Sequence, residues 1–424
     1  MLEPGPSKDK PRFCRNAPVR FSVSAAALGC STPRVVSAFA PQLRRYAEVI
    51  VRIGLNLQRG QRLIITDPFD LQGADRAAAP LVDAVGTAAL EAGATGVDVI
   101  WGDSGRLRSA VAAWPDRAFE RQLDEITARL AAAIANGDAL LFLQSFDPGL
   151  TTGLPAKAVA ALKARTSEAY ARIAPDLLAG TSNWTAAPAP TPAWAEAVFR
   201  GPAPEAALAQ LWTAVFAALR IGDSDPLAAW HCHLDALRTR RADLNRRQLT
   251  AVRFSGPGTD LCLTLATGHV WCAASLRTPQ GIEFTPNLPT EEVFTAPAPD
   301  SAEGTLCVAR PINYGGTALT GIELEFHRGR VVAARARTGG DLLQRLLATD
   351  HGAARLGEVA LVPERTALGR SGVCFFQPLL DENALDHVAL GDAYAFTCRE
   401  SGRPALNQSL IHLDLPIDAM VTLR

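Results

Sequence analysis

Largely apolar runs that recur between helix-like stretches are the strongest constraint on the fold of the first half of the chain. The runs lie at residues 63–66, 96–100 and 139–143. Their apolar character is typical of strands that are buried on both faces. Residues 77–92 and 119–135, which separate them, have the length and composition of helices. Such alternation predicts an α/β fold with a parallel sheet flanked by helices.

The pattern changes near residue 248. Beyond this point apolar and polar residues alternate, as over residues 261–265, which is typical of antiparallel strands with one exposed face. We therefore expect an N-terminal α/β domain over residues 41–248. A mostly antiparallel β (α+β) domain is expected over residues 249–424.

Residues 1–40 contain several Pro, Arg and Ser residues, few acidic ones and no sustained periodicity. This composition predicts a flexible N-terminal extension, because it offers too little apolar surface to form a core. Residues 20–30 also have the order of a lipoprotein signal, which is the competing interpretation. The apolar run there is short and interrupted by Ser, which disfavours a signal.

Charge and cysteine content restrict the partners and the compartment. The 42 basic and 43 acidic residues leave a formal net charge of −1, so no overall field attracts nucleic acid or anionic lipid. The apolar stretches are interrupted well before the roughly 18 residues that a membrane-spanning helix needs. We expect no nucleic-acid or membrane partner. The eight cysteines contain no C-x-x-C pair, which favours reduced thiols in a cytoplasmic protein.

Acidic and histidine residues capable of binding metal gather in the last third of the chain. Glu291 and Glu292 are adjacent, so only one of them can face a given site if the segment is extended. Glu358 opens a short apolar strand, where a buried acid needs a cation, a metal or water. Each acid taken alone is more often a solvated surface residue than a ligand.

Two further pairs extend this set. His412 and Asp414 are two residues apart in a predicted strand, so both side chains project from one face and can bind one metal or two adjacent metals. Glu382 and His387 are five residues apart, about 140° on a helix, so they can bind one metal only through a loop or a distorted turn. Together these oxygen and nitrogen donors favour a divalent metal site in the second domain.

Residues 230–233 contain two histidines and a cysteine but are not expected to bind metal. On a helix His231 and His233 diverge by about 200°, so one ion cannot bind both. This segment is predicted to be a surface turn of a helix.

The segments that carry these acidic and histidine residues resemble the thermophilic metalloaminopeptidases, the aminopeptidase T and aminopeptidase S group. They are residues 287–297, 356–363, 381–383 and 409–414. The likeness extends to residues 51–57, 182–185 and 256–260. It therefore covers the chain from about residue 41 to residue 414.

The resemblance implies that two divalent cations are held by Glu292, Glu358, His387 and Asp414. It makes Glu358 the bridge between the cations, and Glu382 and His412 further ligands or supporting groups. Tyr394 falls where the family has its catalytic tyrosine. Zinc, cobalt, manganese and magnesium all remain open as the native metal. The family also implies a homodimer that encloses its active sites.

The predicted function is a metal-dependent aminopeptidase, which releases N-terminal residues from peptides with a free N-terminus through water activated by two metals. Glu291, which adjoins a predicted ligand, is the candidate for proton shuttling. One alternative is a catalytically inactive homologue that binds peptide or metal. Another is a two-metal hydrolase of a different amide or ester, which a comparison of free and N-acetylated peptides would distinguish.

Overall fold

The computed structural model describes residues 38–67, 73–147, 150, 153–314, 317–399 and 405–424. The expected N-terminal extension therefore lies almost entirely outside the described residues, and so does the segment that resembles a lipoprotein signal. Within the described part, no helix combines the length and the apolar character needed to cross a membrane.

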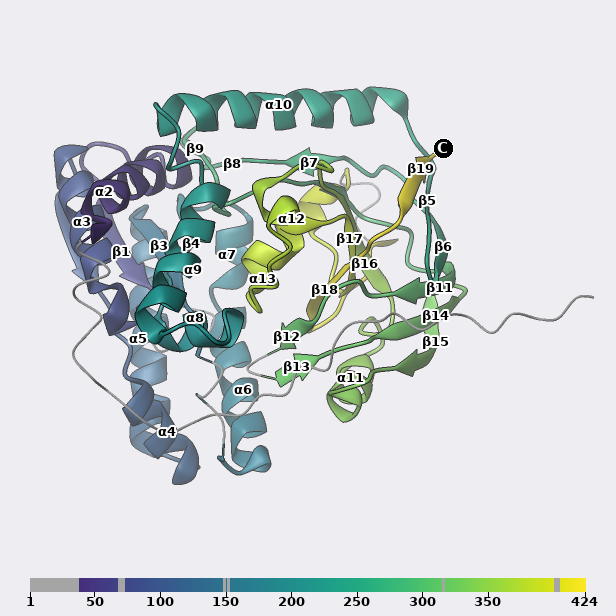
Figure 1. Ribbon diagram of the computed structural model, residues 1–424, viewed down its shortest axis with the longest axis horizontal. Coiled ribbons are helices and arrows are strands. Elements are labelled where there is room, and N and C mark those ends of the chain that lie inside the picture. The colour runs from purple at the N-terminus through teal and green to yellow at the C-terminus, as the bar shows by residue number, and fades with distance from the viewer. Residues whose placement is uncertain (1–37, 68–72, 148–149, 151–152, 315–316, 400–404) are drawn as a thin grey trace, which may run out of the picture.

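A four-stranded parallel sheet forms the centre of the first half (Figure 1). Its strands in spatial order are β2 (Gly96–Val99), β1 (Arg62–Thr66), β3 (Ala139–Gln144) and β4 (Trp184–Pro188). Pairing is parallel throughout, with β1 at the centre between β2 and β3. Strands β1 and β3 are buried along almost their whole length, as a sheet covered on both faces requires.

Helices surround this sheet. They are α2 (Ala40–Val49), α3 (Ala79–Glu91), α4 (Ser104–Ala112), α5 (Arg117–Asn136), α6 (Ala156–Ala171), α7 (Ala174–Leu178), α8 (Pro192–Val198), α9 (Pro204–Ala218) and α10 (Pro226–Arg247). Helix α5 illustrates why they form: Asp116 caps its first backbone amides, and Gly137 ends it in a left-handed conformation. The prediction of a parallel sheet flanked by helices is confirmed.

Antiparallel sheets dominate the second half. The first has the order β18 (His412–Pro416), β17 (His387–Gly391), β16 (Leu356–Leu361), β10 (Val293–Thr295) and β7 (Cys272–Ala273). The second has the order β15 (Arg330–Arg335), β14 (Glu323–His327), β11 (Glu303–Cys307), β6 (Thr259–Thr264), β5 (Ala251–Gly256) and β19 (Met420–Leu423). The prediction of a mostly antiparallel C-terminal part is confirmed.

Shorter elements complete the second half. They are the pairs β8 (Leu276–Arg277) with β9 (Glu283–Phe284) and β12 (Ile312–Tyr314) with β13 (Thr317–Leu319), and the helices α11 (Gly340–Leu347), α12 (Ala367–Ser371) and α13 (Pro378–Asp381). Helices α12 and α13 lie between α9 and the five-stranded sheet (Figure 1).

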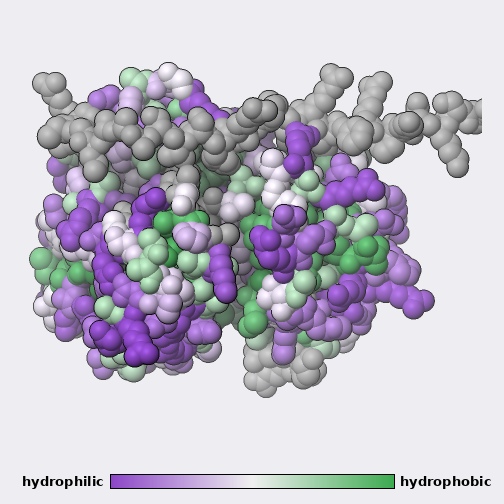
Figure 2. All heavy atoms as spheres, turned by 90° about the horizontal axis from the view of Figure 1, so that it is seen from below, coloured by the Kyte–Doolittle hydropathy of each residue, from purple (hydrophilic) through white to green (hydrophobic). Residues whose placement is uncertain are grey.

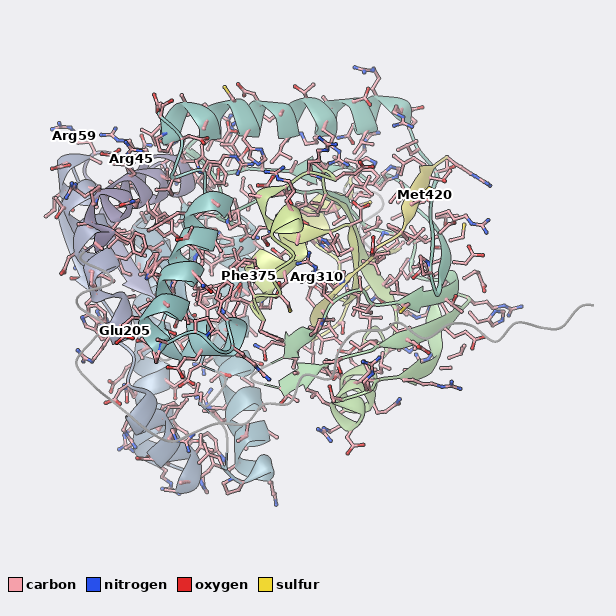
Figure 3. The ribbon with its side chains drawn as sticks, in the orientation of Figure 1. Arg45, Arg59, Glu205, Arg310, Phe375 and Met420 are labelled. Atoms are coloured by element: carbon pink, nitrogen blue, oxygen red, sulfur yellow. The ribbon has the colours of Figure 1, made fainter. Side chains whose placement is uncertain are left out.

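The two halves are joined by hydrogen bonds between buried side chains and backbone. The indole Nε1 of Trp194 in α8 donates to the carbonyl of Phe375 at 2.6 Å, which is labelled in Figure 3. The hydroxyl of Thr185 in β4 donates to the carbonyl of Thr285 at 2.8 Å. Helix α10 runs along one edge of the molecule past both halves (Figure 1). These contacts fix the position of one half relative to the other.

A cavity of about 740 Å³ lies between the halves. Its lining from the first half includes Asp67, directly after β1, and residues 144–147 at the end of β3. The carboxyl ends of neighbouring parallel strands are where open α/β sheets commonly bind ligands. The opposite wall belongs to the five-stranded sheet. Figure 2 shows the surface hollowed between two masses, with apolar side chains bordering the hollow.

Candidate metal centre

One face of the five-stranded sheet collects most of the predicted metal ligands. Directly opposed residues of antiparallel strands share a face. Glu358 of β16 opposes Ala389 of β17, which opposes Asp414 of β18. His387 opposes Ala360, and His412 opposes Gly391. Small residues therefore separate the donors along this face and leave room between them.

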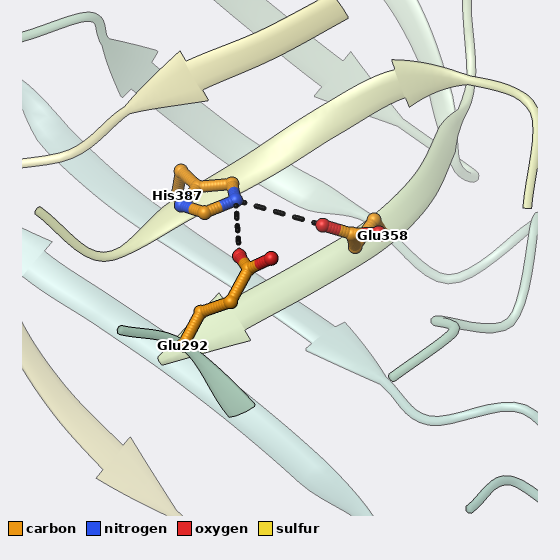
Figure 4. Close-up of side chains that lie close together, drawn as sticks. All are labelled: Glu292, Glu358 and His387. Atoms are coloured by element: carbon orange, nitrogen blue, oxygen red, sulfur yellow. Dashed lines mark ion pairs between the residues drawn. The ribbon is translucent and has the colours of Figure 1, made fainter. Parts of the chain in front are cut away.

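The donor atoms form two groups that share one carboxylate. In the first, Nε2 of His387 lies 3.1 Å from Oε2 of Glu292 and 3.5 Å from Oε1 of Glu358 (Figure 4). In the second, Nε2 of His412 lies 4.0 Å from Oε2 of Glu358 and 3.3 Å from Oδ1 of Asp414. Within each group the ligand atoms lie within 4.8 Å of one another. Glu358 thus offers one oxygen to each group.

Both imidazoles are oriented by backbone carbonyls behind them. Nδ1 of His387 lies 3.2 Å from the carbonyl oxygen of Leu385, and Nδ1 of His412 lies 3.0 Å from that of Asp392. A carbonyl can only accept, so Nδ1 carries the proton and donates in each case. This arrangement directs Nε2 of each ring toward the carboxylates, as in metal-binding histidines, so that Nε2 can bind a metal once it has lost its proton.

Glu292 provides an independent sign that the first group fits a cation. Its Oε2 is buried and has no hydrogen-bond partner among the described residues, although His387 Nε2 is 3.1 Å away. A buried acceptor without a partner costs about 1–3 kcal/mol. A cation between Glu292, Glu358 and His387 would satisfy both the carboxylate oxygen and the imidazole lone pair.

The charges of the cluster compensate one another. Burial raises the pKa of Glu358, and burial together with Asp414 and Glu292 raises that of Glu382 well above its ordinary value. Burial alone would lower the pKa of His412, but Asp414 and Glu358 outweigh it and raise that pKa to about 10. In the absence of a cation, protons therefore bind to some of the donor atoms that a cation would use.

Glu382 and Tyr394 line the same cavity without belonging to either ligand group. Glu382 begins a short 3₁₀ helix, η3 (Glu382–Ala384), and its Oε1 accepts from Nδ2 of Asn383 at 3.3 Å. The ring of Tyr394 lies 5.0 Å from that of His412 and stacks on Phe396. Within the described residues the Tyr394 hydroxyl makes no hydrogen bond, so it is open to a ligand in the cavity.

Glu291 lies away from the ligand groups and does not line the cavity. Its carboxylate accepts from Nη2 of Arg220 at 2.8 Å and lies 3.6 Å from Nε2 of His233. Glu291 and Glu292 thus contact opposite surroundings, as the alternation of an extended segment requires. The ion pair with Arg220 gives no support to the predicted proton shuttle, which stays a prediction.

The prediction that residues 230–233 form a surface turn holds for His231 and Cys232, which are exposed, but is wrong for the other two. Trp230 is fully buried, and its Nε1 donates to the carbonyl of Leu219 at 2.8 Å. His233 donates from Nε2 to the carbonyl of Thr290 at 2.7 Å. Burial and then Arg220 lower the pKa of His233 to about 4, so it stays neutral.

Comparison with known proteins agrees with this geometry. Residues 39–422 match the family of thermophilic metalloproteases (M29). The chain is 39% identical to aminopeptidase T of Thermus thermophilus, covering 89% of this chain and 93% of that protein. It is 34% identical to aminopeptidase AmpS of Bacillus subtilis, covering 90% and 93%.

A solved structure of wild-type AmpT from Thermus thermophilus superposes with a TM-score of 0.82 and 37% identity, covering 91% of this chain and 98% of that one. The fold and the donor cluster define a metallopeptidase. The chain belongs to the thermophilic metalloprotease (M29) family, and the resemblance drawn from its motifs is confirmed.

Glu358→Gln tests the shared carboxylate. Because Glu358 belongs to both groups, we expect this variant to lose most bound metal at both positions, whereas Glu325→Gln on the exposed side of β14 should keep wild-type metal content. Metal is measured by elemental analysis after dialysis of loaded protein. Full metal content in Glu358→Gln would contradict a shared ligand.

Protons should compete with metal at this centre. The pKa of His412 is raised to about 10, so its imidazole is protonated at neutral pH without metal and must lose that proton to bind one. The apparent metal affinity should therefore fall with decreasing pH, about tenfold per pH unit for each proton displaced. Calorimetry in buffers of different ionisation enthalpy measures the protons released. An affinity independent of pH between 6 and 8 would contradict this assignment.

Proposed function

We propose that the protein is an aminopeptidase that uses two divalent cations, and that it removes N-terminal residues from peptides with a free N-terminus. The observation that carries the proposal is the position of Glu358 between two three-residue donor groups. The family and the names of the aminopeptidase relatives support it.

In this proposal the first cation binds Glu292, Glu358 and His387, and the second binds Glu358, His412 and Asp414. His412 thus becomes a ligand in its own right, because its Nε2 lies 4.0 Å from Oε2 of Glu358 and 3.3 Å from Oδ1 of Asp414 and completes the second donor group. Two cations held there, whether zinc, cobalt, manganese or magnesium, would polarise the scissile carbonyl and lower the pKa of an attacking water.

The chain's own side chains would orient the substrate. Glu382 lines the cavity beside Asp414 and offers an acidic partner to the free α-amine, which confines cleavage to the first peptide bond. The Tyr394 hydroxyl has no hydrogen-bond partner to give up among the described residues and can donate to the oxygen that becomes negative as the carbonyl is attacked. The walls of the cavity partly bury these groups, which strengthens their electrostatic interactions.

We also propose a cytoplasmic homodimer divided into domains at residues 41–248 and 249–424. The cysteine pattern supports the compartment, and the family resemblance supports the dimer. Helix α10 ends at Arg247 and β5 begins at Ala251, on either side of the proposed division.

Metal-dependent release of N-terminal residues tests the proposed function. Protein freed of metal by a chelator should be inactive on leucinamide and regain activity when zinc, cobalt, manganese or magnesium is added. N-acetyl-leucinamide should not be cleaved, because its amine cannot pair with the acidic lining. Cleavage of both amides would indicate a different two-metal amide hydrolase. Full metal binding without cleavage of any peptide or amide would indicate an inactive homologue.

Tyr394→Phe tests the proposed oxyanion donor. Loss of one such donor should lower kcat by about 10²-fold or more, with metal content and Tm close to wild type. Tyr314→Phe changes another tyrosine of the cavity lining and should leave kcat within about threefold. If Tyr394 had only a packing role, its kcat would hardly change, and that result would remove it from the mechanism.

A further inference from the structure

One arginine lies among the acids of the cavity. The carboxylates that line it are Asp67, Asp147, Glu292, Glu358, Glu382 and Asp414. Arg241 of α10 is the only lysine or arginine among its described lining residues. Outside the donor groups and their imidazoles, Arg241 is thus the cationic side chain that the described lining offers to a carboxylate.

Arg241 occupies a position on α10 where the helix otherwise buries apolar side chains. The buried residues on this side are Trp230, Leu234, Leu237 and Leu244. They follow one another at helical spacing, and Arg241 lies four residues after Leu237 and three before Leu244, so it shares their side of the helix. Arg241 is half-buried there and lines the cavity, so a charged side chain takes a place in the wall where the stripe would otherwise put an apolar one.

Arg241 also differs from Arg238 and Arg246 of α10 in its partners. Arg238 pairs with Asp235 and Glu283, both at 2.7 Å, and Arg246 pairs with Asp243 at 2.5 Å. Among the described residues, no carboxylate lies within the 4.0 Å of an ion pair with Arg241. Its guanidinium is therefore available to an anionic ligand, for which its planar fork of donors is suited.

The strand order fixes where Arg241 lies relative to the donor groups. Strands β18, β17 and β16 and the residue directly before β10 carry the donors, and β7 follows at the edge of the sheet. Arg241 lines the cavity together with Cys272 of β7, whose thiol its charge influences. From β16 to β7 is two strand spacings, about 10 Å. An extended peptide covers that distance with about three residues.

We propose that Arg241 binds the C-terminal carboxylate of short free peptides, so that the protein selects substrates of two or three residues. This inference rests on the proposed function, because the peptide's amine is taken to lie at the metal ligands and Glu382. Arg241 is then a residue that determines specificity for chain length. It takes no part in bond cleavage.

The test compares two substrates that differ in one group. Metal-loaded wild-type protein is assayed on Leu-Gly-Gly and on Leu-Gly-Gly amide, with release of leucine measured by chromatography. We expect kcat/KM to be at least about tenfold higher for the free acid. Arg241→Gln should raise KM for the free acid about tenfold or more and change the amide by less than about twofold, with unchanged metal content. Arg241→Lys should restore part of the preference.

Arg247→Gln is the matched control, because Arg247 is exposed on the same helix and its removal changes net charge equally. It should leave both substrates unchanged. Parallel losses on acid and amide in Arg241→Gln, or equal losses in the two arginine variants, would overturn the proposal. If wild type releases leucine from neither substrate, the proposed function fails separately. Calorimetric binding of both peptides then decides the role of Arg241, and equal affinities for acid and amide would overturn it.

Discussion

Charge compensation within the buried donor cluster is the constraint on which the rest of the structure depends. Several carboxylates share one face of a sheet, and their mutual repulsion in a poorly hydrated space would be prohibitive without positive partners. Two imidazoles supply part of that charge, and among the described residues the buried Oε2 of Glu292 still has no hydrogen-bond partner, although Nε2 of His387 lies 3.1 Å away. The cluster is therefore suited to binding cations. The register of the strands around it brings its donors together on one face.

The backbone around Glu358 shows how closely the register is specified. The pairing of β16 with β17 is irregular between Leu356 and Glu358. At Gly357, a Cβ atom would lie 2.3 Å from the carbonyl oxygens of Gly391 and Asp392, so no larger residue fits. Ala389 lies between Glu358 and Asp414 on the shared face. Small residues in these strands thus keep space for the donors, which is a different use of glycine and alanine from turn formation.

Local patterns in the sequence predicted those parts of the site that a single strand determines. The two-residue spacing of His412 and Asp414 placed both on one face, and strand alternation required Glu291 and Glu292 to diverge. The pattern left open which of the two glutamates faces the site, because that depends on the buried pair of Glu291 with Arg220. The prediction that His233 lies on the surface is wrong because its partners, Thr290 and Arg220, lie outside its own helix. The apolar runs and alternation that identified both sheets are local, so the fold class could be predicted more completely than the site.

The two sheets contribute different residues to the cavity between the halves. The five-stranded sheet and Glu292, directly before β10, supply every donor of the two groups, whereas the loops after β1 and β3 contribute walls but no donor to those groups. Loops at strand ends tolerate sequence change far better than a buried network of charges does. Relatives that share this sheet can therefore diverge in the peptides they accept by changing only the first half of the chain. In evolutionary terms, the second half retains the metal-binding donors, and substitutions in the first half change which peptides are accepted.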